Sequence, residues 1–444
     1  MKFRGLLAAV VVLAALGGAA WWSEKKEKAD AAKPAADATP KILSIPEDQF
    51  QQIDLAKKNA PATEVSKAGG SWKITQPKPL PADQDSVTSL VTSLSSLSSD
   101  RLIEDKASDL SSYGLTAPNE QVKITQKNGK VQTLLVGDDT PTGSGTFAKV
   151  EGDPRVFTIA SYVKSSLDKT SKDLRDKRLL TFNSDKLTRV GLSAKGQSLE
   201  FGKNNQNEWQ ILKPRPLRAD GLQVDELVRK LKDAKMDVSG TDEDAKKTIA
   251  GFSTGTRVAM ASVTDSSGTQ EVEVRKDKDK NYYAKSSAVE GIYKVLSDFG
   301  DGLDKGLDDF RNKKLLDFGW NDPNKLDIRN GTAQATYQKS GDKWMSGAKQ
   351  MDSASIQSLV DKLRDLSSVK FLDYGAGAAI FEATVTSNDG KRVEKVSVWK
   401  QGDKFYAKRD GEPAVYELDS KAVDDLQKAA SDVKEFQPPK SGKK

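Results

Sequence analysis

Residues 173–182 read DLRDKRLLTF and residues 309–318 read DFRNKKLLDF, so almost the same ten letters occur twice, 136 positions apart. A near-copy at that distance indicates an internal repeat of domain size. Each copy begins like the last turn of a helix, where basic side chains suit the helix dipole. It continues as Leu-Leu-x-Phe, which is typical of a buried strand. We therefore interpret the segment as a joint that closes one unit and runs extended into the next, rather than as a basic binding motif.

Other segments recur at nearly the same offset. SWKITQPKPLPAD (71–83) returns as EWQILKPRPLRAD (208–220), and DKWMSGAKQMD (342–352) is a shorter copy without the prolines. An apolar stripe at helical spacing follows each copy, which predicts a helix with one buried face. The stripes are Val87, Leu90, Val91, Leu94 and Leu97; Val224, Leu227, Val228 and Leu231; and Ile356, Leu359, Val360, Leu363 and Leu366. Just before them stand Asp83, Asp220 and Asp352, which we expect to cap the first N–H groups of these helices.

The second half of each unit also repeats. YGLTAPNEQVKI (113–124), AGFSTGTRVAMASV (250–263) and YGAGAAIFEATV (374–385) each place a glycine before an alternating run. We expect Gly114, Gly251 and Gly375 to form turns, because glycine tolerates positive φ. Two β-rich runs around a Gly-containing turn follow in each unit, and this pattern predicts a hairpin.

These patterns predict an α+β fold of three tandem repeats. Each repeat is expected to hold five or six short, mostly antiparallel strands and two amphipathic helices on one face of the sheet. The predicted bounds are 42–182, 183–318 and a divergent third unit at 319–436. The third unit lacks the closing segment, as expected of a unit without a successor.

The N-terminus predicts a membrane anchor. GLLAAVVVLAALGGAAWW (5–22) carries no charge and is just long enough, at about 27 Å as a helix, to cross a bilayer core. A signal-anchor at 1–22 is favoured, with the body outside the cytoplasm. The alternative is a cleaved signal peptide, since Gly18-Ala19-Ala20 offers a cleavage site. Residues 23–41 read as a flexible tether and 437–444 as a disordered tail.

Composition narrows the functions open to the chain. It has no Cys and no His, so thiolate chemistry, Ser-His-Asp catalysis and His-rich zinc motifs are excluded. The formal charge of +6 comes from 70 basic and 64 acidic residues that are interspersed along the chain. Because no basic block stands out, we expect no nucleic-acid partner.

Four features resemble catalytic or ligand-binding sites, but each favours a structural interpretation. GDDTPTGSG (137–145) precedes a strand and lacks a Walker lysine, so a hairpin loop is expected. The Ser-x-x-Lys spacing at Ser166 and Lys169 lacks its companion motifs. The acidic stretch TDEDAKK (241–247) lacks calcium-loop order and reads as a solvated turn. The aromatic positions Trp72, Trp209 and Trp344 are favoured as core anchors over a glycan-stacking site. No catalytic, cofactor-binding or metal-binding residue is therefore assigned, and no cofactor is expected.

The pattern W-x-[IL]-x-x-P-x-P-L-x-A-D, followed by YGL-x-x-P and then by L-R-D-K-x-L-L-x-F, resembles the bacterial family called domain of unknown function 4340. The resemblance covers 42–182 well, 183–318 fairly, and the third unit only by order and spacing. It implies an N-terminal membrane helix, an extracytoplasmic body and genes often placed beside ABC-transporter components of the gliding-motility type. We therefore expect a non-enzymatic, single-pass protein of the inner membrane that binds protein partners of an ABC-transporter-type envelope complex. The alternative is a periplasmic glycan- or ligand-binding module.

Overall fold

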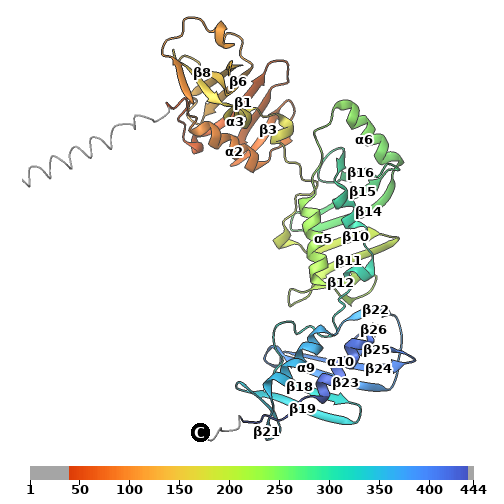
Figure 1. Cartoon of the computed structure of the whole chain (residues 1–444). Coiled ribbons are helices and arrows are strands. Elements are labelled where there is room, and N and C mark those ends of the chain that lie inside the picture. Colours follow the sequence, from red (N-terminus) through yellow and green to blue (C-terminus); the bar gives the residue numbers. More distant parts are fainter. Residues whose placement is uncertain (1–39, 439–444) are drawn as a thin grey trace, which may run out of the picture. The chain divides into compact units, whose positions relative to one another are not determined.

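The computed structural model describes residues 40–438, in which three antiparallel sheets follow one another along the chain (Figure 1). The predicted anchor, tether and tail lie outside the described residues, apart from residues 40–41 and 437–438. Within 40–438 no helix is long and apolar enough to cross a membrane. The chain divides into two compact units: one ends at Lys177, and the other begins at Arg178 and holds the second and third sheets. The predicted bounds of three units stay a prediction.

The first sheet has nine strands in the order β4-β3-β2-β1-β6-β7-β8-β9-β5. The strands are β1 (Phe50–Lys57), β2 (Thr63–Ala68), β3 (Ser71–Gln76), β4 (Leu80–Pro81), β5 (Arg101–Glu104), β6 (Glu120–Gln126), β7 (Val131–Asp139), β8 (Gly145–Val150) and β9 (Val156–Ala160). Its helices are α2 (Gln84–Ser95), α3 (Ser161–Leu167) and α4 (Ser171–Leu174), with short 3₁₀ turns at Glu47–Gln49 and Ser111–Tyr113.

The second sheet has eight strands in the order β13-β12-β11-β10-β14-β15-β16-β17. They are β10 (Arg189–Ala194), β11 (Gln197–Lys203), β12 (Trp209–Lys213), β13 (Leu217–Arg218), β14 (Thr256–Asp265), β15 (Gly268–Lys276), β16 (Tyr282–Ser286) and β17 (Ile292–Val295). The helices are α5 (Gly221–Asp233), α6 (Asp242–Thr254), α7 (Ser297–Leu303) and α8 (Leu307–Phe310), and a 3₁₀ turn covers Ser184–Lys186.

The third sheet again has nine strands, in the order β21-β20-β19-β18-β23-β24-β25-β26-β22. They are β18 (Lys325–Asn330), β19 (Ala333–Ser340), β20 (Lys343–Ser346), β21 (Lys349–Gln350), β22 (Ser368–Leu372), β23 (Ala379–Ser387), β24 (Arg392–Gln401), β25 (Lys404–Arg409) and β26 (Val415–Leu418). The helices are α9 (Ser353–Asp365) and α10 (Ser420–Ser431), with a 3₁₀ turn at Asn388–Gly390.

The predicted α+β class with antiparallel sheets is confirmed, although each sheet has more strands than expected. The extra strands include β4, β13 and β21, whose two residues are too few to give an alternating pattern, and the edge strands β5 and β22. The central strand pairs of the three sheets, β1–β6, β10–β14 and β18–β23, have the same register. Their first strands pair through buried apolar residues at matching positions, which are Ile53↔Ile124, Val190↔Val263 and Leu326↔Val385.

The repeated Asp and Trp positions have the expected structural roles. The side chain of Asp83 accepts a hydrogen bond from the Ser86 N–H at 2.8 Å, and Asp352 accepts one from Ser355 at 2.9 Å. Asp220 caps α5 in the same way. The three tryptophans, Trp72, Trp209 and Trp344, are all buried in the cores of their sheets. Their interpretation as core anchors is confirmed, and buried rings offer no face for stacking on a glycan.

Two predictions about turns are wrong. Gly251 lies inside α6, where a side chain in its place would collide with the Tyr283 ring. The stretch 241–247 begins this helix, because Thr241 and Asp244 form a capping box at its start. Of the three expected turn glycines only Gly114 has the left-handed backbone, with φ of 66°.

Each copy of the ten-residue segment at 173–182 and 309–318 contributes residues to two hydrophobic cores. Leu174 and Phe310, at the end of its helical half, lie in the cores of the first and second sheets. The Leu-Leu-x-Phe half belongs to the next sheet: Leu179, Leu180 and Phe182 enter the second core, and Leu315, Leu316 and Phe318 enter the third. This half therefore opens the sheet that follows and does not close the one before it.

The structure also finds a third copy of each half, which the sequence comparison missed. KILSI (41–45) opens the first sheet, because its Ile42, Leu43 and Ile45 are buried in that core. At the other end, the Asp352 N–H donates to the Lys434 carbonyl at 2.9 Å, as Asp83 does to Leu174 and Asp220 to Phe310 at 2.8 Å. The last sheet thus has its closing segment, written with different letters.

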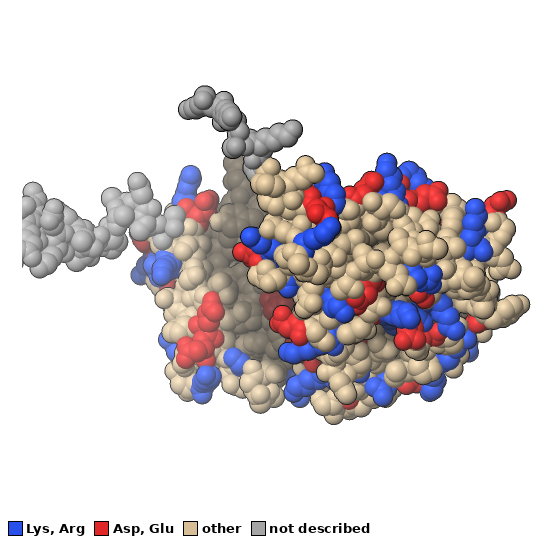
Figure 2. Space-filling model, turned by 90° about the horizontal axis from the view of Figure 1, so that it is seen from below, with Lys and Arg blue, Asp and Glu red and all other residues tan. Residues whose placement is uncertain are grey.

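Charges of both signs are mixed on the surface that Figure 2 shows. Lys and Arg alternate there with Asp and Glu, and no large field of one sign covers that face. The picture agrees with the interspersed charges of the sequence.

Candidate functional site

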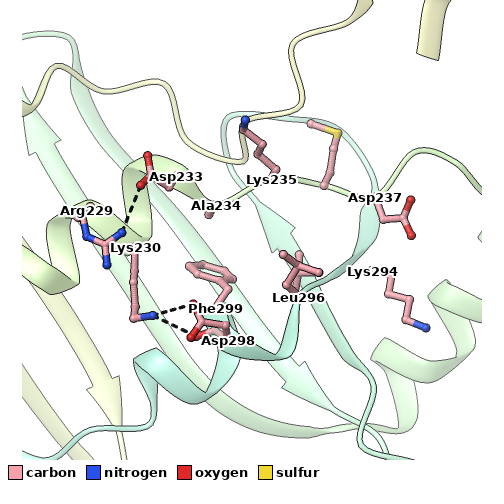
Figure 3. Close-up of a pocket in the computed structure, with 12 residues that line it drawn as sticks. Arg229, Lys230, Asp233, Ala234, Lys235, Asp237, Lys294, Leu296, Asp298 and Phe299 are labelled. Atoms are coloured by element: carbon pink, nitrogen blue, oxygen red, sulfur yellow. Dashed lines mark hydrogen bonds and ion pairs between the residues drawn. The ribbon is translucent and has the colours of Figure 1, made fainter. Parts of the chain in front are cut away.

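A hollow of about 470 Å³ opens on the second sheet (Figure 3). Its walls are the end of α5, the segment 234–237 that follows α5, the end of β17 and the start of α7. A volume of this size lies within the range of ligand pockets, roughly 300–1,000 Å³. No local sequence pattern predicts the hollow, because its lining comes from two stretches about 60 residues apart.

The floor of the hollow is apolar. Ala234, Met236, Val295 and Phe299 line it and are buried. At its lip stands Leu296, the residue before the first turn of α7, with 79% of its surface exposed. A leucine that exposed beside an apolar floor leaves hydrophobic surface in contact with water, which a bound apolar group would cover.

Ion pairs engage most of the charged groups around the rim. The Lys230 ammonium lies 2.8 Å from the Asp298 carboxylate, and this contact lowers the pKa of Asp298. Arg229 binds Glu226 at 2.7 Å and lies 3.7 Å from Asp233. Both pairs within the lining appear as dashed lines in Figure 3. The Lys230–Asp298 pair links the end of α5 to the start of α7, whereas the Arg229 pairs lie within α5.

Two lysines of the rim, Lys235 and Lys294, are not part of these ion pairs. The side chains of Lys235 and Lys294 have no hydrogen-bond or ion-pair partner among residues 40–438, and no dashed line reaches them in Figure 3. Only their backbones are engaged: Arg178 forms a bridge to Lys235, and the Asp237 N–H donates to the Lys294 carbonyl at 2.9 Å. The hollow therefore combines an apolar floor with two unpaired positive charges.

The densest cluster of titratable groups lies elsewhere, between the second and third sheets within the second compact unit. Arg218 contacts Asp317 at 2.7 Å and Glu412 at 2.6 Å, and its guanidinium also donates to the Tyr416 hydroxyl. Burial opposes the charged form of Arg218, but Asp317, Tyr416 and Glu412 outweigh burial and raise its pKa. Arg409 completes the network through Glu394 and Glu412. Because the charges pair with one another across the two sheets, we interpret the cluster as a structural contact between them.

The other sequence features weighed as sites form no reactive arrangement. Residues 140–144 connect β7 and β8, so 137–145 is the expected hairpin. The Ser166 hydroxyl donates to the Val163 carbonyl at 2.7 Å, as a serine in a helix often does. Among the described residues no group of three Asp or Glu side chains is arranged to hold a metal ion.

Comparison with known families gives one match. The family described as domain of unknown function (DUF4340) matches twice, at residues 72–237 and 209–389, and the chain belongs to this family. Both matches begin at the buried tryptophan of β3 or β12, and both contain one copy of the joint motif. No curated protein and no solved structure matches the chain.

Proposed function

We propose that this chain is a non-enzymatic protein of the inner membrane, anchored by residues 1–22, whose extracytoplasmic sheets bind protein partners. The partners we propose are subunits of an ABC-transporter-type envelope complex. Membership of the family supports this placement through the resemblance described above. The proposal extends to the body as a scaffold, in which successive sheets present surfaces to more than one partner.

The hollow is the observation that carries the proposal. An apolar floor, an exposed Leu296 and the unpaired Lys235 and Lys294 offer burial and charge attraction. These are the elements of a recognition site, in which a desolvated apolar centre provides affinity and charges at the rim provide specificity. A catalytic site would instead need a base, a nucleophile or a metal aimed at one reacting atom.

Co-purification tests the proposal. The full chain with a C-terminal tag is extracted in mild detergent, and the accompanying proteins are quantified by mass spectrometry. We expect transporter subunits to be enriched at least tenfold over a control in which residues 1–41 anchor an unrelated exported domain. If transporter subunits are no more abundant than in this control while envelope polysaccharide accompanies the chain, the proposal is wrong.

One observation favours glycan binding as a second candidate function. Trp320 follows the third copy of the opening segment and is 90% exposed, with the Arg364 guanidinium 5.0 Å from its ring centroid. An exposed indole beside a cation suits stacking on a sugar ring. Binding of soluble envelope polysaccharide, followed by tryptophan fluorescence, should then fall in Trp320→Ala and persist in Trp320→Phe. Equal binding by both variants would remove this candidate.

A further inference from the structure

The second sheet differs from its two sister sheets at the wall of the hollow: Ala234 stands where they have leucine, and Met236 stands where they have Ser99 and Ser368. The carbonyl groups of Leu97, Ala234 and Leu366 accept the same hydrogen bond, from the first apolar residue of each opening segment, at 2.7, 2.9 and 3.0 Å. These three residues are therefore structurally equivalent. The first and third sheets bury a leucine there, whereas the second has alanine. The missing side-chain atoms leave space above the floor of the hollow.

Beside this position the second sheet also lacks the edge strand that the first and third sheets have, β5 and β22. In the first sheet the Asp100 N–H donates to the Thr158 carbonyl, and the chain then continues as β5 along β9. In the second sheet Asp237 makes the equivalent bond to Lys294. The chain then turns away to begin α6, so no strand pairs with the outer edge of β17 within the described residues. A strand edge that no other strand pairs with is a place where an extended segment of another chain can pair.

Helix α6 does not occupy the hollow. It packs against β15, β16 and, most closely, β17, and Arg275 of β15 lies 4.7 Å from the Phe252 ring centroid. Helix α7 packs on the opposite face, against Tyr282. No residue of α6 lines the hollow. The hollow therefore stays open at the end of β17, although α6 packs against this strand.

We infer that this hollow binds an extended, acidic segment of a partner protein, with one large apolar side chain on the floor. The apolar side chain would contact Phe299 and Leu296, and carboxylates on either side of it would pair with Lys235 and Lys294. The acidic groups of the rim already have hydrogen-bond or ion-pair partners, whereas the ammonium groups of Lys235 and Lys294 do not, so the rim attracts carboxylates. The inference rests on the proposed function and specifies the chemistry of the partner.

Fluorescence anisotropy tests the inference with the full chain in detergent. The probe is a labelled peptide, Gly-Asp-Glu-Phe-Asp-Glu-Gly, and two matched peptides replace either its Phe by Ser or its acidic residues by Asn and Gln. We expect binding of the probe, at least tenfold weaker binding of both matched peptides, and weakening by salt. Mixed micelles of anionic phospholipid in the same detergent are added as a competitor. If the anionic lipid displaces the probe at micromolar lipid, or if the three peptides bind alike, the inference is overturned.

The sister sheets supply the decisive variant. Ala234→Leu introduces the side chain that Leu97 and Leu366 already hold at this position, so it should narrow the hollow at its floor and leave the fold intact. We expect it to weaken peptide binding at least tenfold, and the double variant Lys235→Gln with Lys294→Gln to do the same. Lys278→Gln, an exposed lysine in the β15–β16 turn, should bind like the unaltered chain. Unchanged affinity in Ala234→Leu, with circular dichroism that matches the unaltered chain, would refute the inference.

The same variant separates this inference from the proposed function. If transporter subunits co-purify equally with the unaltered chain and with Ala234→Leu, the function stands and the hollow is not its docking site. If the peptide binds as expected but no transporter subunit co-purifies with the unaltered chain, the docking site stands and the proposed function fails.

Discussion

Glu120 gives the first sheet a stability that should depend on pH. It is the first residue of β6 and is 5% exposed, and its Oε1 atom has no hydrogen-bond partner among the described residues. Burial raises its pKa from 4.5 to about 7, although Lys57 and Lys164 partly offset burial and Asp168 adds to it. The folded chain therefore holds a proton on this carboxyl that the unfolded chain releases at lower pH.

The sign and size of the effect follow from linkage. Because the pKa is higher in the folded state, the stabilisation is complete below pH 4.5 and is lost as the pH rises from 4.5 through about 7. A change in pKa from 4.5 to about 7 corresponds to about 3 kcal/mol. Glu120→Gln keeps the shape of the neutral side chain and cannot ionise. We therefore expect it to change stability little at pH 4.5 and to stabilise the first sheet by about 3 kcal/mol at pH 8.

Urea unfolding followed by ¹⁹F NMR measures this in one sheet at a time. With 5-fluorotryptophan incorporated, Trp72 reports on the first sheet, because it is the single tryptophan between residues 40 and 177. The exposed Glu151 provides the matched control, and Glu151→Gln should shift the Trp72 transition at neither pH. A gain from Glu120→Gln of the same size at pH 4.5 and pH 8, or a loss at pH 8, would refute the argument.

Three further predictions concern the framework. Arg218→Met removes the central cation from Asp317 and Glu412, so the free energy of unfolding reported by Trp209 should fall by about 3–5 kcal/mol; an unchanged urea midpoint would show that the network adds no stability. Asp220→Ala removes the cap of α5 and should cost about 1 kcal/mol in the same assay, whereas Asp220→Asn should retain most of the cap. A fragment of residues 40–177 should fold alone and give a dispersed amide NMR spectrum, and a collapsed, molten spectrum would contradict its independence.

The sequence predicted those features that depend on local pattern. The stripe of α5 and its cap at Asp220 lie within a few residues of each other, so helical spacing and capping chemistry were enough to predict them. The buried Trp209 and the hairpins likewise follow from alternation and turn residues. The repeat itself was visible because the two joints keep nearly the same letters.

The repeat could not be recognised from the sequence where different residues occupy equivalent positions. KILSI at 41–45 and the segment around Lys434 occupy the same places as the two halves of the joint, but only the matching backbone hydrogen bonds reveal this. Gly251 was expected in a turn, since nothing in its own neighbourhood indicates that the capping box at Thr241 extends a helix that far.

The sequence by itself determined that three related α+β units follow one another, because periodicity, caps and turn residues act over short distances along the chain. The tertiary structure alone decided which core each half of the joint enters, how Arg218 links two sheets, and where a hollow opens. The hollow depends on what packs against Ala234 from β17 and α7, some 60 residues further along the chain. Alanine in place of leucine is inconspicuous in the sequence, and it widens a cavity only where the surrounding residues are held too firmly to close over it.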